Sequence, residues 1–141
     1  MARVVPEIRE WVARRAQFCC EYCKSPQRFS SIAYEVDHII AQKHQGSDSL
    51  DNLAFACLAC NRHKGSDLTT FDPFTGQLTR LFHPRQQLWA DHFELQGSVL
   101  VGRSDVGRST VQLLQFNSAM RVQERSLLVE RGLSPVAPSQ L

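Results

Sequence analysis

The chain has 141 residues, with 16 basic and 14 acidic side chains and a formal net charge of +2 at pH 7. This length favours one domain, or a small domain with an appendage. The weak positive charge neither supports nor excludes nucleic acid as a partner, because dedicated nucleic-acid binders are usually more basic. No apolar stretch approaches the roughly 18–20 residues that a membrane-spanning helix needs, and we expect no membrane segment.

The first segment predicts a helix from Pro6 to Phe18. Proline is favoured in a first helical turn, and the apolar residues Ile8, Trp11 and Val12 recur at helical spacing. The residues before this helix lack the apolar core of a secretory signal peptide. We therefore expect a cytoplasmic protein whose cysteines are reduced.

Two C-x-x-C pairs follow the predicted helix, and their members are Cys20, Cys23, Cys57 and Cys60. Four thiolates complete the tetrahedral shell of Zn²⁺ and leave no open position, so the spacing predicts a structural zinc. Such a site supplies on the order of 10–16 kcal/mol to the folding of a domain too small to be stable alone. The competing interpretation, four unrelated buried cysteines, requires two coincidental pairs. Cys19 lies outside the spacing, and we expect it to be a small buried hydrophobe.

The segment between the two pairs predicts a β-hairpin. The residues from Ile32 to Ile40 are rich in β-branched side chains and indicate a strand that ends near His38. Leu53–Ala56 indicates the second strand, after a polar loop of the kind that often carries functional groups. Beyond the second cysteine pair, Asn61 opens a short predicted helix that Gly65 ends.

The polar residues held within this frame suit phosphodiester hydrolysis. That reaction needs a base to deprotonate water and a hard cation to neutralise developing charge. His38 suits the role of base, because histidine side chains titrate near neutral pH. The Asp37 carboxylate and the Asn61 carbonyl oxygen suit Mg²⁺ or Mn²⁺. Neighbouring side chains on a strand point to opposite faces, so Asp37 and His38 can share one site only where the strand ends or twists.

The order Asp37-His38, Asn52 and Asn61, framed by the cysteine pairs, resembles the HNH endonuclease family and in particular small bacterial HNH nucleases. The resemblance covers Cys20 to about Gly65 and implies an α+β fold with a ββα-metal core, a treble-clef-like arrangement also called a His-Me finger. It implies that His38 is the general base and that Asp37 and Asn61 bind the catalytic Mg²⁺ or Mn²⁺. It also implies that Asn52 ties the hairpin loop together and orients the histidine. The last position is asparagine where the family name has histidine, and a hard-oxygen shell favours Mg²⁺ or Mn²⁺ over a softer metal.

Each of these residues also has a plainer interpretation. Asp37 could only orient His38, Asn52 could be a turn residue, and Asn61 could only cap the helix. Lys64 could contact phosphate, although a solvated lysine is the ordinary expectation.

The composition changes from Thr69 onward. Aromatic residues over 82–93 predict a cluster that packs onto the first domain. The dipeptide Gln96-Gly97 predicts a hairpin turn, Ser109 a helix cap and Gly132 the end of the last helix. Three arginines of this segment could line a DNA groove or form ion pairs, and they are Arg85, Arg103 and Arg108.

We expect three parts: a nuclease core with its N-terminal helix over residues 1–68, an appendage packed on that core over 69–132, and a disordered tail over 133–141. The expected function is cleavage of DNA by a zinc-stabilised endonuclease that uses Mg²⁺ or Mn²⁺, with RNA open as a substrate. The competing hypothesis is a non-catalytic zinc module that binds nucleic acid. Such a module has no need to place Asp37, His38 and Asn61 together. The sequence carries no signal for an oligomeric state.

Overall fold

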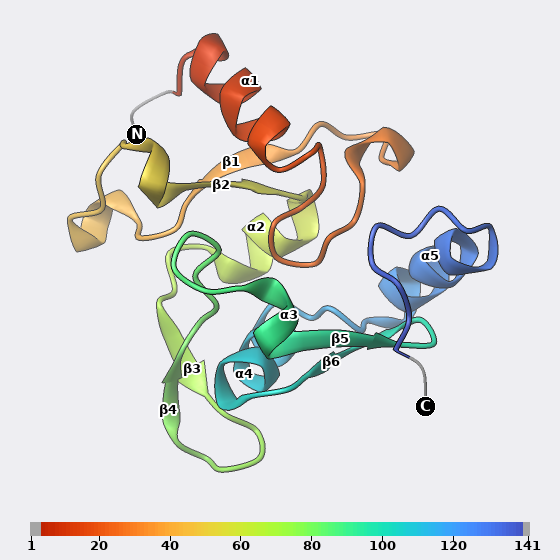
Figure 1. Cartoon of the computed structure of the whole chain (residues 1–141). Helices are drawn as coiled ribbons and strands as arrows, with labels where there is room; N and C mark the ends of the chain where they lie inside the picture. Colours follow the sequence, from red (N-terminus) through yellow and green to blue (C-terminus); the bar gives the residue numbers. More distant parts are fainter. Residues whose placement is uncertain (1–3, 140–141) are drawn as a thin grey trace.

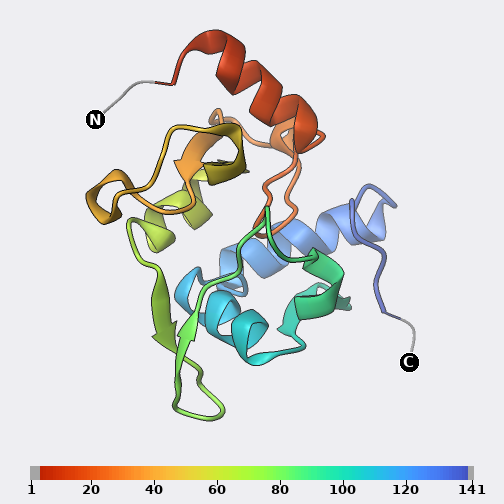
Figure 2. The same ribbon diagram turned by 60° about the vertical axis from the view of Figure 1, so that its left-hand side comes forward.

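The computed structural model describes residues 4–139 and shows a mixed fold of helices and small sheets, as the sequence predicts (Figure 1). The α-helices and strands, in chain order, are α1 (Pro6–Arg15), β1 (Glu35–His38), β2 (Leu53–Ala56), α2 (Leu58–Lys64), β3 (Thr69–Phe71), β4 (Leu78–Arg80), α3 (Trp89–His92), β5 (Phe93–Gln96), β6 (Val99–Gly102), α4 (Asp105–Leu113) and α5 (Ala119–Glu130). The strands pair as three separate antiparallel hairpins, β1–β2, β3–β4 and β5–β6. In Figures 1 and 2, α1 and the β1–β2 hairpin form the upper part of the molecule, and the elements from β3 to α4 form the lower part. None of the helices within residues 4–139 has the length and apolar character needed to cross a membrane.

Helix α1 is shorter than the predicted helix and buries a different face. It ends at Arg15, because the backbone turns into the left-handed region at Gln17 (φ 55°) and Phe18 (φ 58°). Val12 is fully buried, whereas Trp11 is 56% exposed. The expectation that Trp11 belongs to the apolar face was wrong, because each residue rotates about 100° around the helix and the buried face is centred on Val12.

The predicted hairpin is confirmed, with a first strand shorter than expected. Strand β1 ends at His38, and Asp37 pairs with Ala54 while His38 pairs with Leu53. At Gly46, the loop that joins the strands passes close to the backbone of Ile40, where the loop begins. A Cβ atom at this position would lie 1.6 Å from the carbonyl oxygen of Ile40, so the approach requires glycine.

Helix α2 begins earlier than predicted, inside the second cysteine pair. The side chain of Cys57 caps the helix by accepting the backbone N–H of Cys60 at 3.4 Å. The helix ends at Lys64, and Gly65 follows with a φ of 52°, which confirms the predicted end. The cysteine pair therefore fixes the start of the helix.

The helices after β6 differ in one boundary from the prediction. Helix α4 begins after Ser104, whose hydroxyl accepts the backbone N–H of Gly107 at 3.0 Å. Ser109, the predicted cap, lies fully buried within α4, so that expectation was wrong. The hairpin turn at Gly97 (φ 62°) and the helix end at Gly132 (φ 69°) are confirmed.

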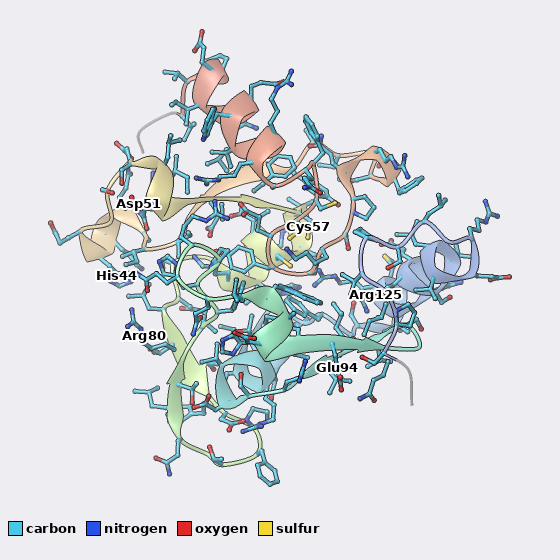
Figure 3. All side chains as sticks on the ribbon, in the orientation of Figure 1. His44, Asp51, Cys57, Arg80, Glu94 and Arg125 are labelled. Carbon is cyan, nitrogen blue, oxygen red and sulfur yellow. The ribbon has the colours of Figure 1, made fainter. Side chains whose placement is uncertain are left out.

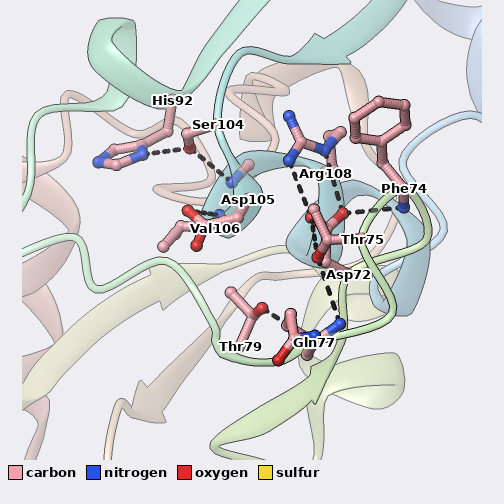
Figure 4. Close-up of polar contacts among 11 residues, drawn as sticks. Asp72, Phe74, Thr75, Gln77, Thr79, His92, Ser104, Asp105, Val106 and Arg108 are labelled. Atoms are coloured by element: carbon pink, nitrogen blue, oxygen red, sulfur yellow. Dashed lines mark hydrogen bonds and ion pairs between the residues drawn. The ribbon is translucent and has the colours of Figure 1, made fainter.

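An ion pair joins the β3–β4 hairpin to α4 (Figure 4). The Arg108 guanidinium donates to both carboxylate oxygens of the fully buried Asp72, at 3.0 and 2.8 Å. These hydrogen bonds hold the pKa of the Asp72 carboxyl well below its usual range. Arg85 pairs with Glu21, and Arg103 donates to the carbonyl oxygen of Ala90 at 2.9 Å. Internal contacts therefore account for the three arginines that the sequence left open.

The predicted aromatic cluster is confirmed in the lower part of the molecule. The ring of Phe93 lies 5.2 Å from Phe82, 5.1 Å from Trp89 and 5.6 Å from Phe116, measured between centroids. The indole N–H of Trp89 donates to the backbone carbonyl of Tyr22 at 2.8 Å. The cluster thus contacts the region of the first cysteine pair.

The last described residues differ from the expected disordered tail. Val136 packs against the core, and the backbone N–H of Ser139 donates to the carbonyl of Leu95 at 2.6 Å. These contacts with β5 give residues 133–139 a defined path. The remainder of the predicted tail, residues 140–141, lies outside the described residues.

Candidate functional site

The four cysteines of the two pairs form one cluster. All four are buried, and their Sγ atoms lie within 4.8 Å of one another. Figure 3 shows the sulfur atoms beside the labelled Cys57. The Sγ atoms of Cys23 and Cys57 are 3.7 Å apart. A tetrahedral zinc with Zn–S bonds of about 2.3 Å has sulfur–sulfur edges of about 3.8 Å, so the cluster fits Zn²⁺.

Hydrogen bonds to sulfur surround this cluster. The backbone N–H groups of Cys23 and Cys60 donate to the Sγ atoms of Cys20 and Cys57 at 3.5 and 3.4 Å. Burial raises the pKa of the Cys20 and Cys60 thiols, because a buried thiolate without a cation is unfavourable. A divalent cation would offset this cost by binding all four sulfurs.

Arg121 brings a positive charge to the cluster from α5. Its Nη2 donates to the Sγ of Cys60 at 3.1 Å and to that of Cys57 at 3.7 Å. Its Nη1 donates to the carbonyl oxygens of Leu114 and Gln115 at 2.8 and 3.1 Å, which fixes the guanidinium. Sequence reasoning missed Arg121, since 61 positions separate it from Cys60 and no spacing rule connects them.

Cys19 lies outside the cluster, as predicted, but it is not a buried hydrophobe. Its side chain is half-buried, and its Sγ lies 3.5 Å from the carbonyl oxygen of Gln17. The backbone turn at Gln17 and Phe18 directs Cys19 away from the other sulfurs. That turn is the physical reason for the difference.

Asp37 points into the interior beside the cysteine cluster. Its carboxylate accepts the hydroxyl of Tyr22 at 2.7 Å and lies 3.1 Å from Nζ of Lys64. Burial raises the pKa of Asp37, while the Lys64 charge and the hydrogen bonds from Tyr22 and Lys64 act in the opposite direction. Lys64 also donates to the carbonyl oxygen of His38 at 3.2 Å and is only 2% exposed. The expectation of a solvated lysine was therefore wrong, because α2 carries Lys64 directly under β1.

His38 faces the loop between the strands instead of the interior. Its Nε2 lies 2.8 Å from Oδ1 of Asp48, and its side chain is 14% exposed. Asp48 also accepts the side-chain amide of Gln42 at 3.1 Å. The hydrogen bonds from His38 and Gln42 lower the pKa of the Asp48 carboxyl. Asp37 and His38 point to opposite sides of the strand, and within residues 4–139 no hydrogen bond joins their side chains.

Asn52 closes the loop that carries Asp48. Its side-chain oxygen accepts the backbone N–H of Ile40 at 2.9 Å. Its amide nitrogen donates to the carbonyl oxygens of Ile40 and Ser47 at 3.0 and 2.7 Å. Asn52 is 7% exposed and holds both ends of the loop, so it is more than a turn residue.

Asn61 lies within α2, one turn before Lys64. Residues three apart in a helix share a face, so Asn61 lies on the same side of α2 as Lys64. The N-cap of this helix is Cys57, and the interpretation of Asn61 as a helix cap was therefore wrong. Its side chain is half-buried and has no hydrogen-bond partner among the described residues.

Comparison with known proteins gives one family. Residues 20–67 match the family model described as HNH endonuclease. The matched segment contains the cysteine cluster, both strands of the first hairpin and all of α2. Neither a curated protein nor a solved structure matches the chain.

Proposed function

We propose, because residues 20–67 match the HNH endonuclease family model, that this protein is a metal-dependent endonuclease that hydrolyses phosphodiester bonds of DNA. One observation supports the proposal: helix α2, which carries Asn61, packs against the hairpin β1–β2, which carries Asp37 and His38, in the segment that also forms a buried cluster of four cysteines. We interpret this unit as the ββα-metal core of the family. Its charged and amide groups are those that the reaction requires.

The cysteine cluster would hold a structural Zn²⁺. Four thiolates fill the tetrahedral shell and leave no position for water, so this metal takes no part in the reaction. Its role is to fix the loop that precedes the hairpin against the first turn of α2, since Cys20 and Cys60 come from these two places. The hairpin between them then has a defined position relative to the helix.

We assign His38 as the general base. If Asp48 accepts the Nε2–H of the neutral imidazole, the lone pair of His38 lies on Nδ1 and can accept a proton from the attacking water. Asp48 then positions the ring. Asn52 holds the loop that carries Asp48, and it therefore helps to orient His38 through Asp48.

We assign Asp37 and Asn61 as the ligands of Mg²⁺ or Mn²⁺. Both offer hard oxygen atoms, and the carboxylate of Asp37 is already in contact with a positive charge, the ammonium of Lys64. When bound, the cation neutralises the charge that develops on the phosphate and on the leaving oxygen. With a cation on Asp37, the ammonium of Lys64 would no longer be needed as its counter-charge and could contact the substrate phosphate.

The competing function is a zinc-dependent module that binds nucleic acid without cutting it. Zinc-loaded protein incubated with supercoiled plasmid in Mg²⁺, in Mn²⁺ or without an added divalent cation separates the two. We expect nicked or linear plasmid with Mg²⁺ or Mn²⁺ and intact plasmid without an added divalent cation. Retarded but uncut plasmid under every metal condition would establish the binding module. Parallel incubation with a labelled RNA of the same sequence decides between DNA and RNA as the substrate.

A further inference from the structure

A pocket of about 220 Å³ lies between the HNH domain and the segment that follows β4. Ile39 and Ile40 line one side of it, and both directly follow His38 in the chain. Arg80, His83 and Gln87 line the other side. Figure 3 shows the labelled Arg80 on the same side of the molecule as His44 and Asp51 of the hairpin loop. The pocket is therefore adjacent to the proposed catalytic residues, and of its lining residues only Lys64 has a role in the function proposed above.

The His83 ring is fixed as a hydrogen-bond donor toward this pocket. Its Nδ1 lies 3.2 Å from the backbone N–H of Arg85 and accepts from it. A neutral imidazole with an accepting Nδ1 carries its proton on Nε2. Burial lowers the pKa of His83, and the positive charges of Arg80 and Lys64 lower it further. The Nε2–H group has no acceptor among the described residues.

Gln87 and Arg80 are further donors without acceptors. The side-chain oxygen of Gln87 accepts the backbone N–H of His83 at 2.9 Å, which leaves the two N–H groups of its amide for another partner. Arg80 is exposed, and its guanidinium forms no ion pair or hydrogen bond with residues 4–139. Three neighbouring side chains thus present donors to one cavity, and one of them is permanently charged.

The acidic groups near the pocket do not satisfy these donors. Asp67 lines the pocket, but its side chain forms no hydrogen bond or ion pair with residues 4–139. The charge of Asp51 raises the pKa of His83, and it is the smallest of the influences on that pKa. Lys64 also lines the pocket, and its ammonium is already paired with Asp37. The lining carries two basic side chains, Lys64 and Arg80, against one acidic side chain, Asp67, and the donors of Arg80, His83 and Gln87 are available to an anion. Phosphate oxygens match this set, because they accept hydrogen bonds from guanidinium, imidazole and amide groups together.

We propose that Arg80, His83 and Gln87 bind a backbone phosphate of the DNA strand, at a position that flanks the bond cut beside His38. This inference rests on the proposed function for the identity of the strand. It assigns to the segment after the HNH domain a direct part in substrate binding. A strand held at both His38 and this pocket has its scissile bond fixed along the β1–β2 hairpin.

Binding of a short fluorescent DNA duplex to zinc-loaded protein, without added Mg²⁺ or Mn²⁺, tests the inference without any cutting. Arg80→Gln should weaken binding by about 10- to 100-fold, the usual effect of losing a charge-assisted hydrogen bond. It should also lower the dependence of log K on log salt by about 0.9, the value for one phosphate contact. Arg131→Gln is the matched control, because Arg131 is exposed at the end of α5, away from the residues that line the pocket, and should bind as the parent does.

A spectroscopic measurement supplies the second arm. In protein labelled with ¹⁵N-histidine, added DNA should shift the Nε2 signal of His83, and Arg80→Gln should suppress the shift. Parent-like affinity and salt slope in Arg80→Gln, or an unmoved His83 signal in parent protein saturated with DNA, would overturn the proposal. Arg80-dependent binding in a protein that never cuts plasmid would refute the nuclease function and leave the pocket standing. A protein that cuts plasmid but whose DNA binding does not depend on Arg80 would refute the phosphate site in the pocket and leave the nuclease function standing.

Discussion

The interior of residues 20–67 adds four clustered cysteines and a buried ion pair to its apolar side chains, whereas the interior of residues 69–139 is centred on aromatic and aliphatic side chains. In the first region Asp37, Asn52 and Lys64 are buried together with the four clustered cysteines. In the second, Phe93, Leu100 and Phe116 are among the most deeply buried residues. Apolar burial stabilises a fold without a ligand, while buried thiols and charges need a partner. The region proposed to carry the chemistry is therefore the one whose stability we expect to depend on metal.

The second region also supports the first. Arg121 donates to the sulfurs of the cysteine cluster, Trp89 donates to Tyr22, and Arg85 pairs with the buried Glu21. These contacts all run from the aromatic region to the region of the cysteine cluster. The comparison therefore predicts that metal loss and substitutions at the contacts affect the two regions unequally.

Loss of the zinc site should have the largest effect. Cys57→Ser removes one thiolate and with it much of the roughly 10–16 kcal/mol that zinc supplies to folding, so the HNH domain should unfold. Elemental analysis should give one zinc per chain in the parent, and circular dichroism of the variant should show the loss of α1, β1–β2 and α2. Cys19→Ser is the matched control and should keep both zinc and fold. A zinc-free parent, or a Cys57→Ser protein that melts as the parent does, would contradict the four-thiolate site.

Substitution of Lys64 should have the next largest effect and should depend on the catalytic cation. Lys64→Met keeps the aliphatic stem but leaves Asp37 buried without its ion pair, which costs about 3–5 kcal/mol of unfolding free energy. Mn²⁺ should restore part of this loss by taking the place of the ammonium. Thermal unfolding should therefore show a larger rise in Tm on addition of Mn²⁺ for Lys64→Met than for the parent. Equal rises in the two proteins would mean that ammonium and cation do not share the position.

Arg121 should affect zinc retention without affecting the fold of the aromatic region. Arg121→Gln removes the charged donor to Cys60 and Cys57, and outer partners of metal ligands are typically worth about 10- to 100-fold in metal affinity. Zinc transfer to a chromogenic chelator should be correspondingly faster, while Arg121→Lys, which keeps the charge, should fall between the variant and the parent. An unchanged transfer rate in Arg121→Gln would show that α5 does not stabilise the cluster.

A helix cap in the aromatic region should have the smallest effect. Ser104→Ala removes the side-chain cap of α4 and should cost about 1 kcal/mol of unfolding free energy, with zinc content unchanged. Ser118→Ala is the matched control, because Ser118 begins α5 without a side-chain cap bond. Urea unfolding measures both, and equal costs for the two variants would show that the Ser104 bond contributes nothing specific.

Local rules in the sequence were enough to locate the frame of the candidate site. The C-x-x-C spacing predicted the cysteine cluster, and the β-branched residues before His38 predicted β1. Gly65 predicted the end of α2, because a glycine is favoured where the backbone adopts a positive φ. Each of these signals lies within a few residues of the structure that it forms.

The contacts that organise the site depend on residues far apart in the chain. Asp48 approaches His38 only because Asn52 folds the loop back, and Lys64 reaches Asp37 only because α2 packs under β1. Ser109 was mistaken for a cap because it is a good capping residue by type, while the chain uses Ser104. Sequence patterns give the type of a residue, but tertiary packing selects which candidate is used.

The central claim is that His38 is the base of a metal-dependent reaction in a zinc-held domain, and cleavage by His38→Ala tests it most directly. Supercoiled plasmid should be cut by saturating enzyme in Mg²⁺ or Mn²⁺, with zinc content and thermal unfolding measured on the same preparations. We predict a fall of about 10²–10⁴-fold in the rate for His38→Ala, with zinc and fold retained. His44→Ala, which alters an exposed histidine bonded to the carbonyl oxygen of Ser66, should cut as the parent does. A folded, zinc-loaded His38→Ala protein that cuts at the parent rate would contradict the claim.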